Sequence, residues 1–524
     1  MTRSSRIWHL LNGGLLLLVL LGARLGYWHV LRGRELQPVA LDPVVAAAQY
    51  AGDRDPEAPV TLEGLPQPVI QRTIIALQGL ERGAIYDRNG QPLAFNEVDA
   101  NGVTVRRYTD PSLAHVVGYA SGVGTGVTGL ERAFNLSLLG LDRLDTRINQ
   151  TLHRPVQGSH VYLTIDSRIQ RAATEALAGR TGAVVVLDAH SGAVLAMTSA
   201  PTFDPNQILE PDYMRALLEG CGGGCPSVLL NRATQGLYTP GSTWKTVTLI
   251  AALDSGQTAP DRVFDFGPSV RTANGSYFVY EVDGGVITDP NHPEQVLNLT
   301  QSFAASANAA FARLGDELGG ERMLNYAGRL GFSSSRGAPP IEIDASAGQI
   351  SNNPADIRDN NLLRASAAIG QGEVLATPLN MALVIAAVVN AGDVPRPHLL
   401  QSVRHPDGQV LSSEPRGNWI SNAMKPATAE LVRGMLINNI LAGKPASAAV
   451  PGATAGGKTG TAQLGGALAP HAWYVGFADD GQHSVAIAVI IETTGSSRSL
   501  AAPVFAQAAA AALRFLNEAV EAGT

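Results

Sequence analysis

The sequence is short of the features on which nucleic-acid-binding and nucleotide-binding proteins rely. Its 524 residues carry a formal net charge of −7 at pH 7, and the sequence pI is about 5.9. A chain with this acidic balance is not expected to bind nucleic acid. No glycine-rich phosphate-binding pattern stands between a predicted strand and a predicted helix, so nothing indicates a bound nucleotide or dinucleotide.

Cysteine is nearly absent. The only two cysteines, Cys221 and Cys225, stand on either side of three glycines. No histidines stand near them to complete a zinc-type ligand set, and no metal is predicted elsewhere in the chain. Outside the cytoplasm the pair could close a disulfide, and two free thiols are the alternative.

Lysine is also scarce. Of the 38 basic residues only four are lysines, at positions 245, 425, 444 and 458, and the other 34 are arginines. Arginine stays protonated and cannot act as a base. A chain this rich in arginine keeps a lysine more readily where arginine cannot serve. Lys245 and Lys458 are the two lysines that lie in recognisable motifs.

An apolar stretch near the N-terminus predicts contact with a membrane. Residues 7–23 are largely apolar, and Tyr27 and Trp28 follow as possible interfacial anchors. The extended stretch is long enough to span a bilayer, although a cleaved signal peptide is the rival interpretation. Because no clear small-residue cleavage site follows, we expect residues 1–34 to form an uncleaved single-pass anchor with a short cytoplasmic tail.

The length exceeds that of one ordinary domain, so at least two are expected beyond the anchor. Residues 37–70 are rich in proline and alanine and read as a linker. Short β-type runs and glycine turns follow, including 82–90, which reads as a strand ending in an Asn-Gly turn. We therefore expect a linker and a small β-rich domain over 35–158.

The remaining residues, 159–524, predict an α+β fold in which an antiparallel sheet is covered by helices. Asp166 and Ser167 are expected to cap a helix, 238–450 is expected to be mainly helical, and Pro503 is expected to start a final helix through about Val520. Strands at both ends of the unit suggest one sheet assembled from both termini. The predicted strands are 182–188, 193–197, 456–463, 472–478 and 485–492.

The stretch with the clearest chemistry is the turn and helix start at 238–254. Pro240-Gly241 is a turn pair, and Ser242 and Lys245 stand three residues apart, on one face of a helix. A hydroxyl is a weak nucleophile until a base removes its proton, and a neutral lysine amine can be that base. Taken alone, the pair is also compatible with a capping serine and a surface lysine.

Two further constellations accompany this pair. Ser306-Ala307-Asn308 lies in a small-residue region, where polar residues in a helix–loop segment are the ordinary interpretation. Lys458-Thr459-Gly460-Thr461 lies on a predicted strand, where an edge strand with an exposed lysine is the ordinary interpretation. Glycines in such a strand would let a substrate backbone approach closely and pair with it.

Together and in this order, Ser-x-x-Lys, Ser-x-Asn and Lys-Thr-Gly form a specific signature. On these motifs the chain resembles the class B penicillin-binding proteins, which are peptidoglycan D,D-transpeptidases. The resemblance extends over roughly residues 70–515 and implies the transpeptidase fold, preceded by a pedestal domain and one N-terminal transmembrane helix. Blocks that also resemble this family are 82–90, 129–131, 161–170, 182–197, 201–206, 370–378 and 471–476.

The resemblance implies a role for each residue of the three motifs. Ser242 would be the acylated nucleophile and Lys245 the base that takes its proton. Lys458 would be a second cation, and burial together with this like charge would lower the Lys245 pKa. Ser306 would relay a proton to the leaving amine, and Asn308 would hold the substrate amide.

The remaining implied roles concern binding. Thr459, Gly460 and Thr461 would bind the substrate, with the two threonines on its terminal carboxylate. The backbone N–H groups of Ser242 and Thr461 would form the oxyanion hole. Trp244, like the histidine and tryptophan of the 471–476 block, is expected to pack rather than to do chemistry.

The implied reaction is a two-step acyl transfer without a cofactor. The serine attacks the D-Ala-D-Ala end of a peptidoglycan stem peptide, and an amine of a second peptide resolves the acyl-enzyme. β-Lactams would acylate the same serine, and a separate glycosyltransferase would be a partner at the membrane. The alternatives are a D,D-carboxypeptidase or β-lactamase-like hydrolase, and a non-catalytic β-lactam-binding scaffold.

Overall fold

The computed structural model describes residues 80–523 except 121–125, 144, 147–155, 209, 220–226, 273–274, 291, 334, 444, 464–468 and 493–496. The predicted anchor and linker and the Cys221–Cys225 loop therefore lie outside the described residues. The described parts of 81–121, 127–143 and 157–523 belong to one compact unit, to which the description below refers.

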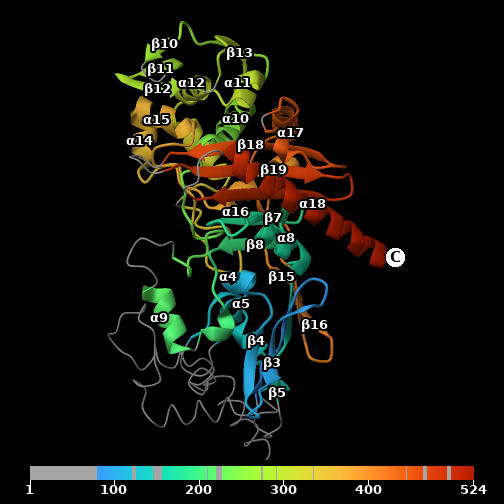
Figure 1. Cartoon of the computed structure of the whole chain (residues 1–524). Coiled ribbons are helices and arrows are strands. Elements are labelled where there is room, and N and C mark those ends of the chain that lie inside the picture. The colour runs from blue at the N-terminus through green and yellow to red at the C-terminus, as the bar shows by residue number, and fades with distance from the viewer. Residues whose placement is uncertain are drawn as a thin grey trace, which may run out of the picture. The chain divides into compact units, whose positions relative to one another are not determined.

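A five-stranded antiparallel sheet forms the centre of this unit (Figure 1). Its order is β18 (Thr454–Ala462), β19 (His471–Asp479), β20 (Ser484–Ile491), β7 (Gly182–Asp188) and β8 (Val194–Ala200). The predicted sheet assembled from both ends of the domain is confirmed. The predicted strand bounds are correct to within about two residues, except that β8 continues to Ala200 instead of ending at residue 197. β18, which carries the Lys-Thr-Gly motif, is an outermost strand.

Both faces of the sheet are covered by core clusters. Successive side chains of a strand point to opposite faces, so each strand contributes to both clusters. Val185 and Leu187 of β7 pack into the larger core cluster, which includes α16 (Pro378–Val389). Val184 and Val186 point the other way, into a second cluster with α8 (Ser167–Leu177) and α18 (Ser497–Gly523). A helix covered on all sides is apolar all round, and α16 is buried from Pro378 to Val388.

The last helix begins earlier than the sequence predicts. α18 starts at Ser497 and contains Pro503 within its length, so the prediction that Pro503 opens the helix is wrong. A proline inside a helix costs about 3 kcal/mol or more. Ala501 and Ala502 before it and Phe505 after it are fully buried against the sheet, and this packing offsets the cost. The cap of α8 is confirmed, since the Asp166 side chain accepts from the Arg168 N–H.

One segment of α18, Leu500–Ala519, is long and apolar enough to cross a membrane, as judged over the described residues alone. Just over half of its apolar window is buried inside the protein. Ala508, Ala509 and Ala512 of this segment belong to the core cluster between α18 and the sheet. Packing in the domain therefore accounts for its apolar character.

A helical region follows the serine-bearing turn. It comprises η5 (Gly241–Trp244), α10 (Lys245–Asp254), α11 (Leu299–Ala305), α12 (Asn308–Leu318), α13 (Gly320–Arg329), α14 (Pro354–Asp359), α15 (Asn361–Ala368) and α17 (Pro426–Leu441). The expected helical character is confirmed. Between α10 and α11 the chain also forms strands that the sequence analysis did not predict.

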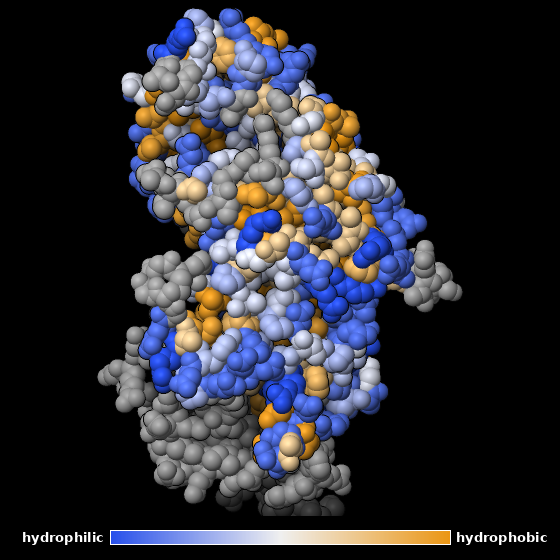
Figure 2. All heavy atoms as spheres, in the orientation of Figure 1, coloured by the Kyte–Doolittle hydropathy of each residue, from blue (hydrophilic) through white to orange (hydrophobic). Residues whose placement is uncertain are grey.

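These strands make a small β region. They are β9 (Val263–Asp265), β10 (Val270–Thr272), β11 (Gly275–Val282), β12 (Gly285–Asp289) and β13 (Val296–Asn298). Asp283 and Gly284 join β11 to β12 with positive φ angles of 47° and 75°, as a two-residue hairpin turn requires. Exposed valines gather here, and Figure 2 shows hydrophobic surface at this upper end of the molecule.

The N-terminal part of the unit is β-rich, as expected. β2 (Ile85–Tyr86), β3 (Pro92–Val98) and β4 (Thr104–Tyr108) form half of a six-stranded sheet with the order β16-β15-β6-β2-β3-β4. The other half comes from later in the chain: β6 (His160–Leu163), β15 (Leu400–Arg404) and β16 (Val410–Ser413). The shorter elements are β1 (Leu80–Glu81), η3 (Pro111–Leu113), α4 (Ala114–Val117), α5 (Gly129–Ala133), α6 (Asn135–Leu138), β5 (Val156–Gln157), η4 (Pro205–Gln207), α9 (Pro211–Glu219), β14 (Val394–Pro395), β17 (Asn418–Ile420) and η6 (Ala446–Ala448).

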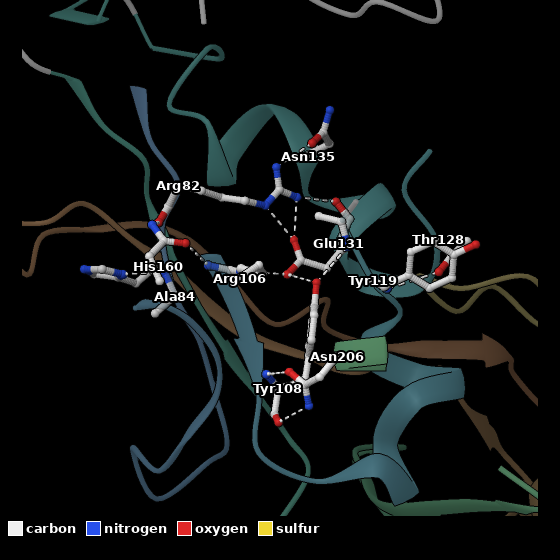
Figure 3. A network of polar contacts seen from close by, with 12 residues as sticks. Arg82, Ala84, Arg106, Tyr108, Tyr119, Thr128, Glu131, Asn135, His160 and Asn206 are labelled. Carbon is white, nitrogen blue, oxygen red and sulfur yellow. Dashed lines mark hydrogen bonds and ion pairs between the residues drawn. The ribbon is translucent and has the colours of Figure 1, made fainter. Parts of the chain in front are cut away.

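A buried carboxylate organises this β-rich part. Glu131 of α5 is fully buried and accepts from Arg82 Nε at 2.6 Å and from Arg106 Nε at 2.8 Å. Figure 3 shows the two guanidinium groups converging on it from different elements, with Asn135 and Tyr108 alongside. Arg82 also donates to Asn135 Oδ1 at 2.7 Å. The network ties the segment before β2, strand β4 and helices α5 and α6 together.

Candidate active site

The serine-bearing turn lies directly against β18. Gly241 has a φ of +53°, and a Cβ on it would lie 2.6 Å from the Thr461 carbonyl oxygen. A Cβ on Gly460 would lie 2.7 Å from the Pro240 carbonyl oxygen. Only glycine allows this approach at both positions. The two glycines therefore bring Ser242 beside the Lys-Thr-Gly strand.

Ser242 and Lys245 lie one turn apart. η5 is a 3-10 helix that carries Ser242 and passes into α10 at Lys245, whose backbone N–H donates to the Ser242 carbonyl. Residues three apart in a 3-10 helix stand one above the other. Ser242 is half-buried and Lys245 is fully buried. The lysine thus lies beneath a serine that remains accessible.

The side chain of Lys245 reaches the second motif. Its Nζ donates to the Ser306 carbonyl at 2.6 Å, to Asn308 Oδ1 at 2.7 Å and, at 3.4 Å, to Ser306 Oγ. Lys458 Nζ donates to the same Ser306 Oγ at 2.9 Å. The structure therefore brings residues of all three motifs, Lys245, Ser306 with Asn308, and Lys458, into a single hydrogen-bonded cluster.

The conformation of Ser306 explains how the second motif reaches this cluster. Ser306 ends α11 in the left-handed region, with φ 61° and ψ 38°. Its N–H donates to the Phe303 carbonyl, and the Ala307 N–H donates to the Ser302 carbonyl, the pattern of a Schellman cap. A non-glycine residue in this region costs about 1–2 kcal/mol, and such strain is concentrated at functional sites.

The environment of Lys245 favours the neutral amine. Burial lowers the pKa of Lys245 from its ordinary value of 10.5 to about 7, while the negative charge of Asp289 acts in the opposite direction. The predicted effect of burial on the Lys245 pKa is therefore confirmed. The predicted effect of Lys458 on that pKa stays a prediction.

The third motif presents a mixture of buried and accessible groups. Lys458 is 3% exposed, which contradicts the ordinary interpretation of an exposed lysine on an edge strand. Gly460 is buried, Thr459 is half-buried and Thr461 is exposed. β18 is outermost in its sheet, and an outermost strand is where an extended peptide can add to a sheet.

Neighbouring aromatic residues support the site by packing. Trp244 is fully buried and meets Phe332 edge-to-face at 4.6 Å between ring centroids. Trp473 Nε1 donates to the Thr239 carbonyl at 3.1 Å, and His471 packs against the ring of Tyr238. These contacts agree with the expected packing roles.

In the described part of the chain no group of three or more His, Cys, Asp or Glu side chains could hold a metal ion.

Two positions beside the motifs escaped the sequence analysis as site residues. Gly370 accepts a hydrogen bond from the Gly241 N–H at 3.0 Å, and a Cβ on Gly370 would lie 2.1 Å from the Gly241 carbonyl oxygen. Asp289, at the end of β12, is fully buried and accepts from the Ala309 N–H at 2.9 Å. The Asp283-Gly284 turn signal could have placed β12, but no sequence pattern connects Asp289 to the active-site motifs.

Comparison with known proteins gives one consistent result. Residues 182–510 match the family described as penicillin binding protein transpeptidase domain. The peptidoglycan D,D-transpeptidase PbpA of Mycolicibacterium smegmatis is 33% identical over 469 residues, which cover 85% of this chain and 92% of that protein. PbpA of Mycobacterium tuberculosis H37Rv is 31% identical over 468 residues, covering 85% of this chain and 91% of that protein.

Solved structures agree with the sequence comparison. The penicillin G acyl-enzyme complex of penicillin-binding protein A from M. tuberculosis aligns with a TM-score of 0.72 and 29% identity, covering 83% of this chain and 99% of that one. The D,D-transpeptidase domain of a peptidoglycan glycosyltransferase from Eggerthella lenta aligns with a TM-score of 0.71 and 30% identity, covering 83% of this chain and 99% of that one. Both alignments cover more of this chain than the region 182–510 that matches the family.

Proposed function

The chain belongs to the penicillin-binding protein transpeptidase family, and we propose that it cross-links peptidoglycan by D,D-transpeptidation through an acyl-enzyme on Ser242. The observation that carries the proposal is the cluster of Lys245, Ser306, Asn308 and Lys458 behind the serine-bearing turn. The cluster supplies a buried amine one turn from an accessible hydroxyl, which is what an activated serine nucleophile needs.

In the first step Lys245 takes the proton of Ser242, whose oxygen attacks the penultimate D-Ala carbonyl of a stem peptide. Because its pKa is about 7, a substantial fraction of Lys245 is neutral at physiological pH. The peptide bond to the terminal D-Ala breaks, and an ester to Ser242 forms. The amine of the departing D-Ala must receive a proton.

In this proposal Ser306 delivers that proton. Its Oγ lies within hydrogen-bond reach of both lysine amines, at 3.4 Å from Lys245 Nζ and 2.9 Å from Lys458 Nζ. A proton taken by Lys245 can therefore pass through this hydroxyl to the leaving amine. In the second step an amine of another stem peptide attacks the ester, loses a proton to the same relay, and releases Ser242.

β18 supplies the binding surface in this proposal. An extended stem peptide adds to the outer edge of β18, with Gly460 allowing its close approach. Thr459 and Thr461 bind its terminal carboxylate, and Asn308 holds the substrate amide. The backbone N–H groups of Ser242 and Thr461 stabilise the oxyanion. The contact of Gly241 with the Thr461 carbonyl oxygen supports this placement. No metal or organic cofactor takes part in these steps.

β-Lactams are expected to acylate Ser242 as well, and this acylation provides the test. We expect a fluorescent penicillin to label the wild-type protein stably, and to label neither Ser242→Ala nor Lys245→Arg. Arginine cannot accept the serine proton. Labelling of Ser242→Ala would contradict the assignment of the nucleophile. Rapid turnover of the drug by the wild type would indicate a β-lactamase-like hydrolase instead.

The setting of the reaction is part of the proposal. Residues 1–34 would anchor the chain in the cell membrane as a single pass, 35–158 would form the linker and pedestal, and 159–524 would form an extracytoplasmic transpeptidase domain. A separate glycosyltransferase would supply the glycan strands. The apolar stretch at 7–23 supports the anchor. Release of the full chain from membranes by salt alone, without detergent, would contradict it.

A further inference from the structure

Asp289 is a buried carboxylate that belongs to none of the three catalytic motifs. It ends β12, outside the central sheet, and is fully buried. Burial works to raise the pKa of Asp289, but the hydrogen bond from His292, the positive charge of Lys245 and the N–H groups of Ala309 and Asn308 together hold this pKa below its ordinary value. The side chain is therefore a charged group inside the protein.

The first role of this carboxylate is at the start of α12. Ala307, the residue that precedes the helix, has no side chain that can cap it. Asp289 Oδ2 takes this place from another element, accepting from the Ala309 N–H at 2.9 Å. A carboxylate at a helix N-terminus satisfies free N–H groups and complements the helix dipole. It thereby fixes the first turn of α12, where Asn308 stands.

The neighbouring residue completes the hold on Asn308. The Thr288 carbonyl accepts from Asn308 Nδ2 at 3.0 Å, so the other end of the amide, Oδ1, faces Lys245 Nζ at 2.7 Å. The end of β12 thus holds Asn308 in two ways. The Thr288 carbonyl binds the Asn308 side chain, and the Asp289 carboxylate caps α12, the helix that begins at Asn308. Because Asn308 in turn holds the Lys245 amine, the hairpin acts on the proposed base through one intermediate residue.

His292 lies on the far side of the carboxylate. Its Nε2 is 3.4 Å from Asp289 Oδ2, and its Nδ1 donates to the Glu294 carbonyl at 2.9 Å. The ring is stacked on Phe278. Asp289 is thus close to the His292 ring, and it also interacts electrostatically with Lys245.

We propose that Asp289 is a positioning residue for the acyl transfer, which holds Asn308 on Lys245 and whose charge sets how readily Lys245 loses its proton. The inference rests on the proposed function, because it assumes that Lys245 is the base. It assigns to the β11–β12 hairpin a part in the reaction that the three motifs do not contain.

The sign of the electrostatic effect follows from the groups around Lys245. Burial lowers its pKa, and the Asp289 charge opposes this. Ser306 and Asn308 contact the amine, Lys458 approaches through Ser306 Oγ, and the Phe311 ring lies 5.7 Å away. Removing the Asp289 charge leaves burial less opposed, so the Lys245 pKa falls. The rise of acylation rate with pH should then move to lower pH.

The test is the pH profile of acylation by a fluorescent penicillin in the full-length protein carrying Asp289→Asn. Asparagine keeps an oxygen that can accept from Ala309 but removes the charge. We expect the midpoint of the profile to fall by about half a pH unit or more, while the plateau rate stays near that of the wild type because the hydrogen bond to the Ala309 N–H is kept. Glu281→Gln is the matched control, since this carboxylate is exposed on the same hairpin. It should behave as the wild type.

A second variant separates charge from position. Asp289→Glu keeps the charge but displaces the carboxylate, so it should lower the plateau and leave the midpoint near that of the wild type. An Asp289→Asn protein whose midpoint equals that of the wild type would overturn the proposal, whatever its melting temperature. If Asp289→Asn does not fold, a wild-type plateau in Asp289→Glu would overturn it. Absence of acylation in the wild type itself would instead contradict the proposed function.

Discussion

Burial gives Lys245 its chemistry. An exposed lysine is protonated at neutral pH and cannot take a proton from serine. In this chain the Lys245 amine is enclosed, and it donates hydrogen bonds to Ser306 and Asn308. None of these oxygens carries a full charge to compensate the ammonium. The neutral form is therefore accessible near pH 7. Arginine could not take the serine proton, which explains why this arginine-rich chain has a lysine at position 245.

The pH dependence of acylation follows from this burial. The neutral amine predominates above the Lys245 pKa, so the rate of acylation by a β-lactam should be low at pH 5.5 and rise with a midpoint close to pH 7. The second-order acylation rate measured from pH 5 to 9 tests the expectation. A rate that is independent of pH across this range would mean that Lys245 is not the group whose deprotonation limits the reaction.

Single residues could be predicted from the sequence only where spacing carries the chemistry. Ser242 and Lys245 are three apart on one helix, so local geometry alone places them together. Ser306 and Lys458 were predicted through a resemblance, because no local rule joins segments so distant in the chain. Asp289 was missed because its partners lie on another element, and a lone aspartate at the end of a strand has no distinguishing pattern.

The element on which the site depends is the junction between η5 and β18. It is close enough that Gly241, Gly370 and Gly460 each meet backbone from a neighbouring segment. Backbone in such contact holds the nucleophile at a fixed place relative to the Lys-Thr-Gly strand. The cost is that no side chain is tolerated at the contact, even the smallest.

Gly241→Ala should therefore impair acylation strongly. Its methyl group would meet the Thr461 carbonyl oxygen at 2.6 Å, so the turn or the strand must shift, and we expect the acylation rate to fall at least about tenfold. The matched control is Gly256→Ala, which also has a positive φ, +71°, but has no heavy atom within 4 Å of an added Cβ. Equal acylation rates in the two variants would show that backbone strain alone accounts for the loss.

The buried Glu131 network gives a prediction about stability. Glu131→Gln leaves Arg82 and Arg106 without their shared carboxylate, and removing one partner of a buried ion pair typically costs about 3–5 kcal/mol. We expect a clear fall in the denaturant midpoint of unfolding. Glu97→Gln is the control, because its pair with Arg107 is 52% and 45% exposed and is worth about 0–1 kcal/mol. Equal midpoints for the two variants would contradict a structural role for the network.

Elements were predicted well where periodicity and caps agree, and less well where packing overrides local rules. The strands at 182–188 and 485–492 and the Asp166 cap were predicted because an unbroken apolar run bounded by turn residues and a capping side chain are both local signals. Pro503 was wrongly predicted to open the last helix, since its position inside α18 depends on burial against the sheet. The β9–β13 strands were missed because few of their side chains are buried, so they leave little apolar pattern in the sequence.

At the scale of the whole molecule, the five-stranded central sheet and the six-stranded sheet each join segments that are distant in the sequence. The central sheet pairs β7 with β20, and the prediction from strands at both ends of the domain was correct. The six-stranded sheet was not predicted as one unit, because β15 from 400–404 pairs with β6 from 160–163, and non-local pairing has no local signal. Strands β2, β3 and β4 are thereby continuous with β6, β15 and β16 in one sheet.

The measurement that tests the account most directly is the fate of the acyl group. The full-length protein would be given a peptide ending in D-Ala-D-Ala together with a labelled D-amino acid as acceptor. We expect the terminal D-Ala to be exchanged for the labelled residue, and Ser242→Ala to abolish the exchange. Product that carries only a free carboxylate, without incorporated label, would show a carboxypeptidase. Exchange that persists in Ser242→Ala would contradict the central claim that Ser242 carries the acyl group.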